Sequence, residues 1–344
     1  MLSTVLAATL AVNSNPWTMV VGGDIMLNAV SAKQNPFAAI APAMKSADIA
    51  YANLEVPLTT VRTGTPRKSA AEIKARSQYI LKADPAHAKW LAVSGIDVVS
   101  LANNHAMDYG DAGRIQMVKA LEAQGVAHTG AGTNLAEARR PAVLTVKGKL
   151  RIGFISSLSF LTEGAIYKCW PATAKAPGIA GFTVGGATNK ASDTKVRAIV
   201  TEAKKHCDIL VVCLHWGVEK QTVPKAYQVT LGRQFLTQGA DVVLGAHPHV
   251  LQGAELYGKK PLFYSLGNFT SPKSGATALF RLHFDGKTYK SAEIIPYRYS
   301  VGVTSLPKAA AAATAASGFR QLSNAMVRAF PHKSTQAIHP NLAK

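Results

Sequence analysis

The sequence has few cysteines and no long apolar run, and each shortage excludes a class of protein. The three cysteines, Cys169, Cys207 and Cys213, form no CxxC pair, so neither a thiolate zinc site nor a disulfide framework is indicated. No apolar stretch approaches the ~20 residues that span a bilayer. P-loop, GxGxxG, GxSxG and CxxCH motifs are also missing, which argues against Walker-type NTP hydrolysis, dinucleotide binding and serine hydrolase chemistry.

Acidic residues are scarce relative to basic ones. The chain has 19 Asp and Glu against 38 Lys and Arg, a net charge of +19 and a pI near 9.9. Such a balance attracts polyanions, for example an acidic polymer or an anionic surface. The basic residues are spread along the chain, so a solvated basic surface without a dedicated partner is an equal alternative. No RNA-binding, zinc-finger or basic-heptad signature is present, so no specific nucleic-acid partner is expected.

Three regions are expected along the chain. Residues 1–15 form an apolar N-terminal segment of the signal-sequence type, although the positively charged start is missing because the first lysine is Lys33. This segment favours an extracytoplasmic location, in the periplasm or at the cell surface, with a cytoplasmic location as the alternative. Residues 16–300 are expected to form the main domain, and residues 301–344 a C-terminal Ala-rich extension and helix, in which 308–317 is a linker or a weak helix.

Short apolar strands alternate with helical patterns through the main domain. The expected strands are 18–22, 49–54, 98–102, 209–214 and 242–245, and the expected hairpins are 143–156, 251–266 and a pair around 285–286. The strands are apolar on both faces, as in a sheet that helices cover on each side. The pattern therefore predicts an α/β fold with mixed β-sheets, or two packed sheets, flanked by helices.

A residue that can bind a metal follows several of these strands at a constant distance. Glu55, Asn104 and His215 each lie seven residues after an Asp that precedes the strand, and His247 lies six residues after Asp241. In a mostly parallel sheet these residues emerge at one carboxyl edge, where open α/β sheets bind their ligands.

The His247-Pro248-His249 segment is the sharpest local motif. Alternate residues of an extended chain point the same way, and the intervening proline stiffens their spacing. Neutral imidazoles suit Zn, Fe, Mn or Ni. A pair of surface histidines is the alternative, just as helix capping is the alternative for Asp24 and Glu55 at their strand ends.

The joint pattern indicates a dinuclear hydrolase more strongly than any of its parts. His105 is placed to donate a proton to a leaving group. Lysines and arginines in nearby loops would bind an anionic substrate, or they are ordinary solvated residues. The predicted metal ligands are Asp24, Glu55, Asn104, His215, His247 and His249, and the predicted substrate-binding residues are Lys68, Arg76, Glu219 and Asn268.

Seven stretches between residues 18 and 270 together resemble the CapA family of poly-γ-glutamate capsule biosynthesis proteins. They are GGDIM (22–26), NLE (53–55), SLANNH (100–105) with DYG (108–110), GAG (130–132), HWGVE (215–219), GAHPHV (245–250) and YSLGNF (264–269). The resemblance implies a calcineurin-like metallophosphatase fold with its metal site at the carboxyl ends of the strands.

The same resemblance implies roles for individual residues. Asp24 and His249 would hold one metal, Glu55 would bridge, and His105 would act as the acid. The second metal would be held by Asn104, His215 and His247. The wider superfamily usually has a histidine where this chain has Met26, a poor ligand for a hard cation, so the first metal position is expected to be weak or empty.

The resemblance implies a protein of synthesis, export or attachment of poly-γ-glutamate or a similar cell-envelope polyanion. It would use one or two divalent ions (Mn, Fe, Zn or Mg) and have a membrane-bound polymer synthetase as a candidate partner. One alternative is a freestanding metal-dependent hydrolase of a phosphoester or another anionic substrate. The other is a non-catalytic polyanion-binding module.

Overall fold

The structure, a computed structural model, describes residues 15–65, 67–160, 165, 168–184 and 193–343. The apolar segment expected at residues 1–15 therefore lies outside the described residues, apart from Asn15. None of the helices in the described ranges is long and apolar enough to cross a membrane.

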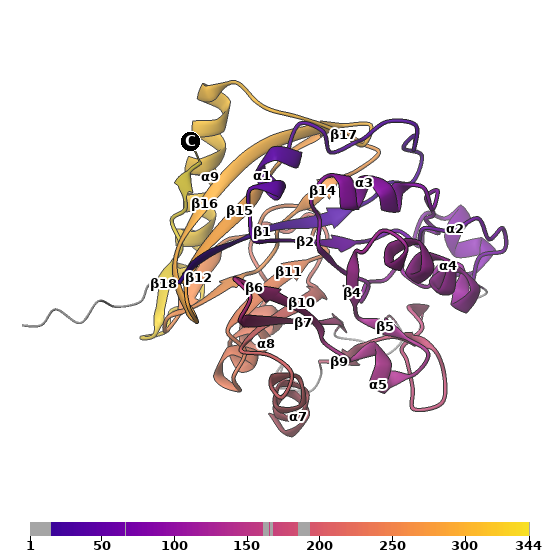
Figure 1. Ribbon diagram of the computed structural model, residues 1–344, viewed down its shortest axis with the longest axis horizontal. Coiled ribbons are helices and arrows are strands. Elements are labelled where there is room, and N and C mark those ends of the chain that lie inside the picture. Colours follow the sequence, from indigo (N-terminus) through magenta and orange to yellow (C-terminus); the bar gives the residue numbers. More distant parts are fainter. Residues whose placement is uncertain (1–14, 66, 161–164, 166–167, 185–192, 344) are drawn as a thin grey trace, which may run out of the picture.

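Two mixed β-sheets form the centre of the molecule (Figure 1). The first sheet runs in the order β17 (Val303–Ser305), β16 (Thr288–Ser300), β15 (Gly275–Asp285), β1 (Pro16–Ile25), β2 (Ile49–Leu54), β3 (Val98–Ser100), β4 (Ala127–Thr129), with β14 (Asn268–Thr270) beside β1 and β19 (Asn341–Leu342) beside β16. The second runs β18 (Thr335–Ala337), β12 (Ala254–Tyr257), β13 (Lys260–Phe263), β11 (Val242–Ala246), β10 (Ile209–Trp216), β7 (Leu150–Phe160), β6 (Ala142–Val146), with β9 (Gly181–Thr183) beside β7. A small sheet pairs β5 (Ala131–Gly132) with β8 (Gly178–Ile179).

Helices cover the outer faces of both sheets. On the first sheet lie α1 (Ala41–Lys45), α3 (His87–Val93) and α4 (Gly110–Glu122), with α2 (Ala70–Lys74) in the loop after β2. On the second lie α7 (Asp193–Lys204) and α8 (Ala226–Thr237), and α5 (Leu135–Ala138) precedes β6. A continuous apolar cluster joins the inner faces, in which Val21 of β1 and Phe280 of β15 meet Phe154 of β7 and Phe263 of β13. The chain thus forms four layers, helix–sheet–sheet–helix.

The expected hairpins are confirmed. Strands β6 and β7, β12 and β13, and β15 and β16 each pair antiparallel, the last across the Asp285-Gly286 turn. The expected strand at 98–102 ends earlier, at Ser100.

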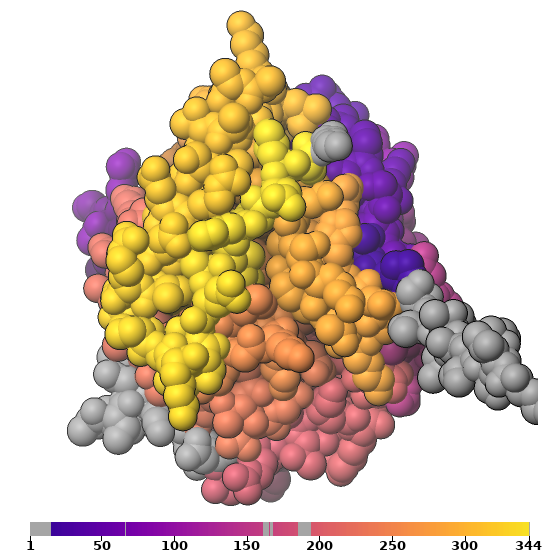
Figure 2. Space-filling model, turned by 90° about the vertical axis from the view of Figure 1, so that its left-hand side faces the viewer, coloured from indigo at the N-terminus to yellow at the C-terminus, as the bar shows by residue number. Residues whose placement is uncertain are grey.

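The Ala-rich stretch is a helix and not a linker. Helix α9 (Ala309–Ala329) buries Ala316, Phe319, Ser323 and Met326, and alanine is the strongest helix former. Phe319 enters the core between the sheets. Figure 2 shows the yellow C-terminal residues packed beside the orange residues that precede them, on one face of the molecule. Residues after 300 also supply β17 and β19 to the first sheet and β18 to the second.

Parallel pairing sets the position of the site. Strands β1, β2, β3 and β4 are mutually parallel, and so are β7, β10, β11 and β13. The carboxyl ends of each set therefore lie along one edge of its sheet. The two edges meet where the backbone N–H of His247, after β11, donates to Asp24 Oδ2 at the end of β1, 3.0 Å away.

Candidate metal centre

The structure brings the six predicted ligands together where the two sheet edges meet. Asp24 lies at the end of β1 and His215 near the end of β10. Glu55 follows β2 directly, and the remaining three residues lie in the loops after β3 and β11. The six residues come from five strand ends or loops, because His247 and His249 share the loop after β11. The spacing predicted one carboxyl edge of a single sheet, whereas the structure divides the ligands between two sheets.

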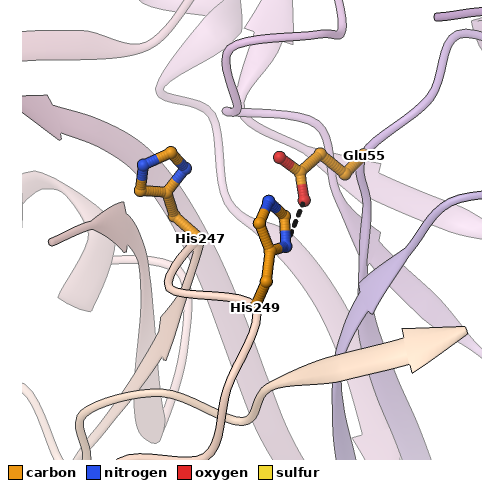
Figure 3. A group of neighbouring side chains, drawn as sticks. All are labelled: Glu55, His247 and His249. Atoms are coloured by element: carbon orange, nitrogen blue, oxygen red, sulfur yellow. Dashed lines mark ion pairs between the residues drawn. The ribbon is translucent and has the colours of Figure 1, made fainter. Parts of the chain in front are cut away.

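One group of donor atoms surrounds the His249 ring. Its Nδ1 lies 3.3 Å from Asp24 Oδ2, 3.8 Å from Glu55 Oε2 and 3.0 Å from Asn268 Oδ1. Figure 3 shows Glu55 and His249 facing one another, with His247 beside them. We call these four atoms the first donor set.

A second group surrounds the His215 ring. Its Nε2 lies 2.7 Å from Asn104 Oδ1, 3.0 Å from His247 Nδ1 and 3.4 Å from Glu55 Oε1. We call these four atoms the second donor set. Glu55 contributes one carboxylate oxygen to each set, which places it between the two.

The donor atoms fit divalent cations. Both oxygens of Glu55 are buried and have no hydrogen-bond partner among the described residues, although buried polar groups are nearly always paired. His215 Nε2 faces an amide oxygen, a carboxylate oxygen and another imidazole nitrogen, and it has at most one proton for all three. Atoms that bind one cation at ~2.1 Å lie roughly 3.0–3.4 Å apart. Most of the distances from His249 Nδ1 and His215 Nε2 to the other donors of their sets fall in this range. A mixture of imidazole, carboxylate and amide donors suits Mn, Fe or Zn.

The electrostatics of the group follow from burial and from opposite charges. Burial opposes ionisation of Glu55, but the imidazoles of His249 and His215 outweigh it and hold the pKa of this carboxyl below its ordinary value. Burial, reinforced by His215, lowers the pKa of His247 well below that of a free imidazole. Burial alone would also lower the pKa of His249, but Glu55 and Asp24 raise it to about 10. A cation in the first donor set must therefore displace a proton from His249.

The expected extended conformation of the His-Pro-His segment is wrong. His247 has φ +95° and His249 φ +59°, in the left-handed region that non-glycine residues rarely adopt. Each such residue costs roughly 1–3 kcal/mol, and strain of this kind gathers at functional sites. The turn lets His247 face the second donor set while His249 faces the first.

Two asparagines that the sequence analysis did not single out hold the ligands. Asn53 Nδ2 donates to Asp24 Oδ1 at 2.8 Å, which leaves Oδ2 for the first donor set. Asn103 donates to the carbonyl of Leu54 at 2.8 Å and accepts from the backbone N–H of His105 at 3.1 Å. Both lie within the NLE and SLANNH motifs, beside residues that were predicted.

The predicted proton donor His105 lies at the rim of the site. Its Nδ1 lies 2.7 Å from Asp108 Oδ2, an arrangement that orients the ring and leaves Nε2 for a substrate. Asp108 also forms an ion pair with Lys68, which donates to the carbonyls of Asn104 (2.9 Å) and Tyr79 (3.0 Å). Lys68 is only 3% exposed, so its ammonium group braces the His105 loop instead of facing substrate.

Two adjoining clefts open over the donor sets. One, of about 480 Å³, is lined by Arg76, Asn104 and His247, and the other, of about 410 Å³, by His249 and Asn268. Both are also lined by four shared residues: Tyr79, His105, Glu219 and Lys220. Of the predicted substrate-binding residues, Arg76, Glu219 and Asn268 line a cleft and Lys68 does not.

Most of the chain is similar to bacterial capsule synthesis proteins. Residues 18–273 match the family described as bacterial capsule synthesis protein PGA_cap. Capsule biosynthesis protein CapA of Bacillus anthracis is 28% identical over 298 residues, which cover 83% of this chain and 68% of that protein. PGA biosynthesis protein CapA of Bacillus subtilis (strain 168) is 30% identical over 254 residues, which cover 72% of this chain and 61% of that protein. The matched region thus spans about two thirds of the length of these relatives.

The fold itself is shared with a solved phosphatase. A crystal structure described as a novel phosphatase from Mycoplasma pneumoniae superimposes with a TM-score of 0.52 at 13% identity, covering 83% of this chain and 95% of that one. The predicted metallophosphatase-like layered fold is therefore confirmed, while metal binding by the six ligands stays a prediction.

Proposed function

Because the chain belongs to the bacterial capsule synthesis protein family, we propose that it acts on poly-γ-glutamate or a similar anionic cell-envelope polymer through a dinuclear metal centre. The observation that carries the proposal is the position of Glu55. Its two buried oxygens lack hydrogen-bond partners in the described part of the chain, and each lies in a different donor set. A carboxylate shared in this way is typical of two-metal hydrolases.

The first donor set would hold one cation and the second set the other. When bound, the cations would polarise a carbonyl or phosphoryl oxygen and lower the pKa of a water. The chain's own residues supply the remaining requirements of a hydrolysis. Asp108 orients the His105 ring, and His105 Nε2 gives its proton to the leaving oxygen or nitrogen as the bond to carbon or phosphorus breaks.

The charge of the chain supports an anionic substrate. Arg76 lines one cleft and Lys220 lines both, and the net charge of +19 attracts a polyanion over a longer range. A location outside the cytoplasm belongs to the same proposal and rests on the apolar residues 1–15. A protein that acts on such a polymer outside the cytoplasm would have a membrane-bound polymer synthetase as its partner.

A freestanding phosphoesterase is the second candidate, favoured by the pairing of the buried Asp108 with His105, which lines both clefts. The two functions share the metal centre and differ in substrate. Poly-γ-glutamate that is shortened by the cation-loaded protein favours the first, and turnover of an aryl phosphodiester alone favours the second. Salt-sensitive polymer binding without any turnover indicates a non-catalytic binding module.

The metal centre can be tested by stripping the protein with a chelator, reloading it with Mn, Fe, Zn or Mg, and measuring metal by elemental analysis. We expect about two cations per chain in the parent and a large loss in the His247→Ala/His249→Ala double variant. The matched control is His206→Ala/His339→Ala, because both of these histidines are exposed. Equal metal content in the parent and the first double variant would overturn the proposal.

A further inference from the structure

Asn268 lies inside the first donor set, where the sequence had indicated a substrate contact. Its Oδ1 is 3.0 Å from His249 Nδ1, and its side chain is almost wholly buried, at 9% exposure. Asn268 is also the register partner of Asp24 in the parallel pairing of β14 with β1. The amide and the carboxylate therefore leave adjacent strands at the same level.

A hydrogen bond to Tyr299 sets the orientation of the Asn268 side-chain amide. Asn268 Nδ2 donates to the hydroxyl oxygen of Tyr299 on β16 at 2.9 Å, and Tyr299 is itself buried, at 7% exposure. This bond turns the carbonyl oxygen of Asn268 towards His249 and away from solvent. An oxygen held in this way is preorganised to bind a cation.

Two glycines of β1 allow β14 to lie close beside Asp24. The amide of Asp24 donates to the carbonyl of Gly267 at 2.9 Å. A Cβ on Gly23 would lie 1.8 Å from that same oxygen, and one on Gly22 would lie 2.4 Å from the Phe269 ring. The two glycines of the GGDIM motif are thus required by the YSLGNF segment, although about 240 residues separate them.

The number of protein donor atoms in the first donor set explains why Asn268 is held beside His249. Without Asn268 the first set would have only three protein donors, and Met26, which lines the same cleft, is a poor ligand for a hard cation. We propose that Asn268 Oδ1 completes the first cation position, and that Tyr299 is its positioning residue. The resulting set has three oxygens and one nitrogen, whereas the second has two of each, so the first position suits the harder Mn²⁺ or Mg²⁺.

This inference rests on the proposed metal centre and is tested with Mn²⁺ on the full chain. Metal content is measured after dialysis and affinity by calorimetric titration, with no assay of activity. We expect Asn268→Leu to lose about one cation per chain or to bind it ~10–100-fold more weakly. Asn268→Asp should retain binding because it keeps the oxygen, and Tyr299→Phe should weaken binding by a smaller factor.

Asn341→Leu is the control for the same change of side chain. Asn341 is exposed on β19 and lies outside both donor sets, so this variant should bind as the parent does. If Asn268→Leu does not fold, Asn268→Ala takes its place. Parent-like stoichiometry and affinity in the oxygen-deleting variant would overturn this inference alone. A parent that binds no cation would overturn the metal centre itself.

Discussion

Substitution of Glu55 with Gln should remove most of the stability that this protein gains from divalent cations. Glu55 is fully buried, and each of its oxygens lies in a different donor set. Glutamine keeps one oxygen and puts an NH₂ group in place of the other. At least one set therefore faces hydrogens instead of a lone pair, and both lose the negative charge that they share.

The size of the effect follows from linkage. A cation at 100 times its Kd that binds only the folded state contributes about 2.7 kcal/mol. If the substitution weakens binding ~100-fold, the same concentration contributes only about 0.4 kcal/mol. At roughly 2 °C per kcal/mol, the rise in Tm on adding cation should fall from about 5 °C to under about 1 °C.

Glu255→Gln provides the matched control. Glu255 is also fully buried, but Arg233 donates to both of its oxygens at 2.8 Å and the Tyr264 hydroxyl donates at 2.7 Å. Breaking this paired charge should cost about 3 kcal/mol. The loss should be the same with and without cation, because Glu255 lies outside both donor sets.

The assay is thermal unfolding followed by circular dichroism, with each protein measured in chelator and in Mn²⁺ buffer. Glu55→Gln should change the difference in Tm between the two conditions, whereas Glu255→Gln should lower Tm equally in both. A Glu55→Gln variant with the full cation-dependent rise in Tm would refute the bridging role of this carboxylate.

Three further variants test the structure around the site. Gly23→Ala should lower the free energy of unfolding in urea by about 3 kcal/mol, because its methyl group would overlap the backbone carbonyl of Gly267. Lys68→Met should cost a similar amount, about 3 kcal/mol, since it leaves the buried carboxylate of Asp108 without its cation. Burial lowers the pKa of His87, so the folded protein binds this proton less readily than the unfolded chain and loses stability as the pH falls below about 6.5. His87→Gln should reduce that loss between pH 7 and pH 5, measured by urea unfolding at each pH.

Each variant has a control on the same chain. Gly318→Ala places its methyl group in open space on α9 and should be neutral or stabilising. Lys89→Met and His206→Gln alter exposed side chains and should change stability by less than about 0.5 kcal/mol. A parent-like Gly23→Ala or Lys68→Met would contradict the packing described here, as would a His87→Gln variant with the pH dependence of the parent.

Local patterns in the sequence predicted the layered fold, which is confirmed, and six candidate ligands, whose metal binding stays a prediction. Apolar strands, their turn residues and the polar residue that follows each strand are all properties of short segments. Because parallel strands end at one edge, the sequence predicted a common site for Glu55, Asn104, His215 and His247. The first two follow strands of one sheet and the last two strands of the other, so it is the packing of the two sheets that brings them together. The family resemblance assigned Asp24 and His249 to the same metal and gave Glu55 the role of bridge.

The surroundings of Lys68 and Asn268 were decided only by tertiary structure. As single residues in polar loops, both resemble substrate contacts. Sheet register and loop packing instead bury Lys68 against Asp108 and set Asn268 beside Asp24, with Tyr299 behind it. The left-handed backbone of His247 is likewise imposed by its surroundings. Such contacts join residues far apart along the chain, and their energy depends on distances and burial that no short segment specifies.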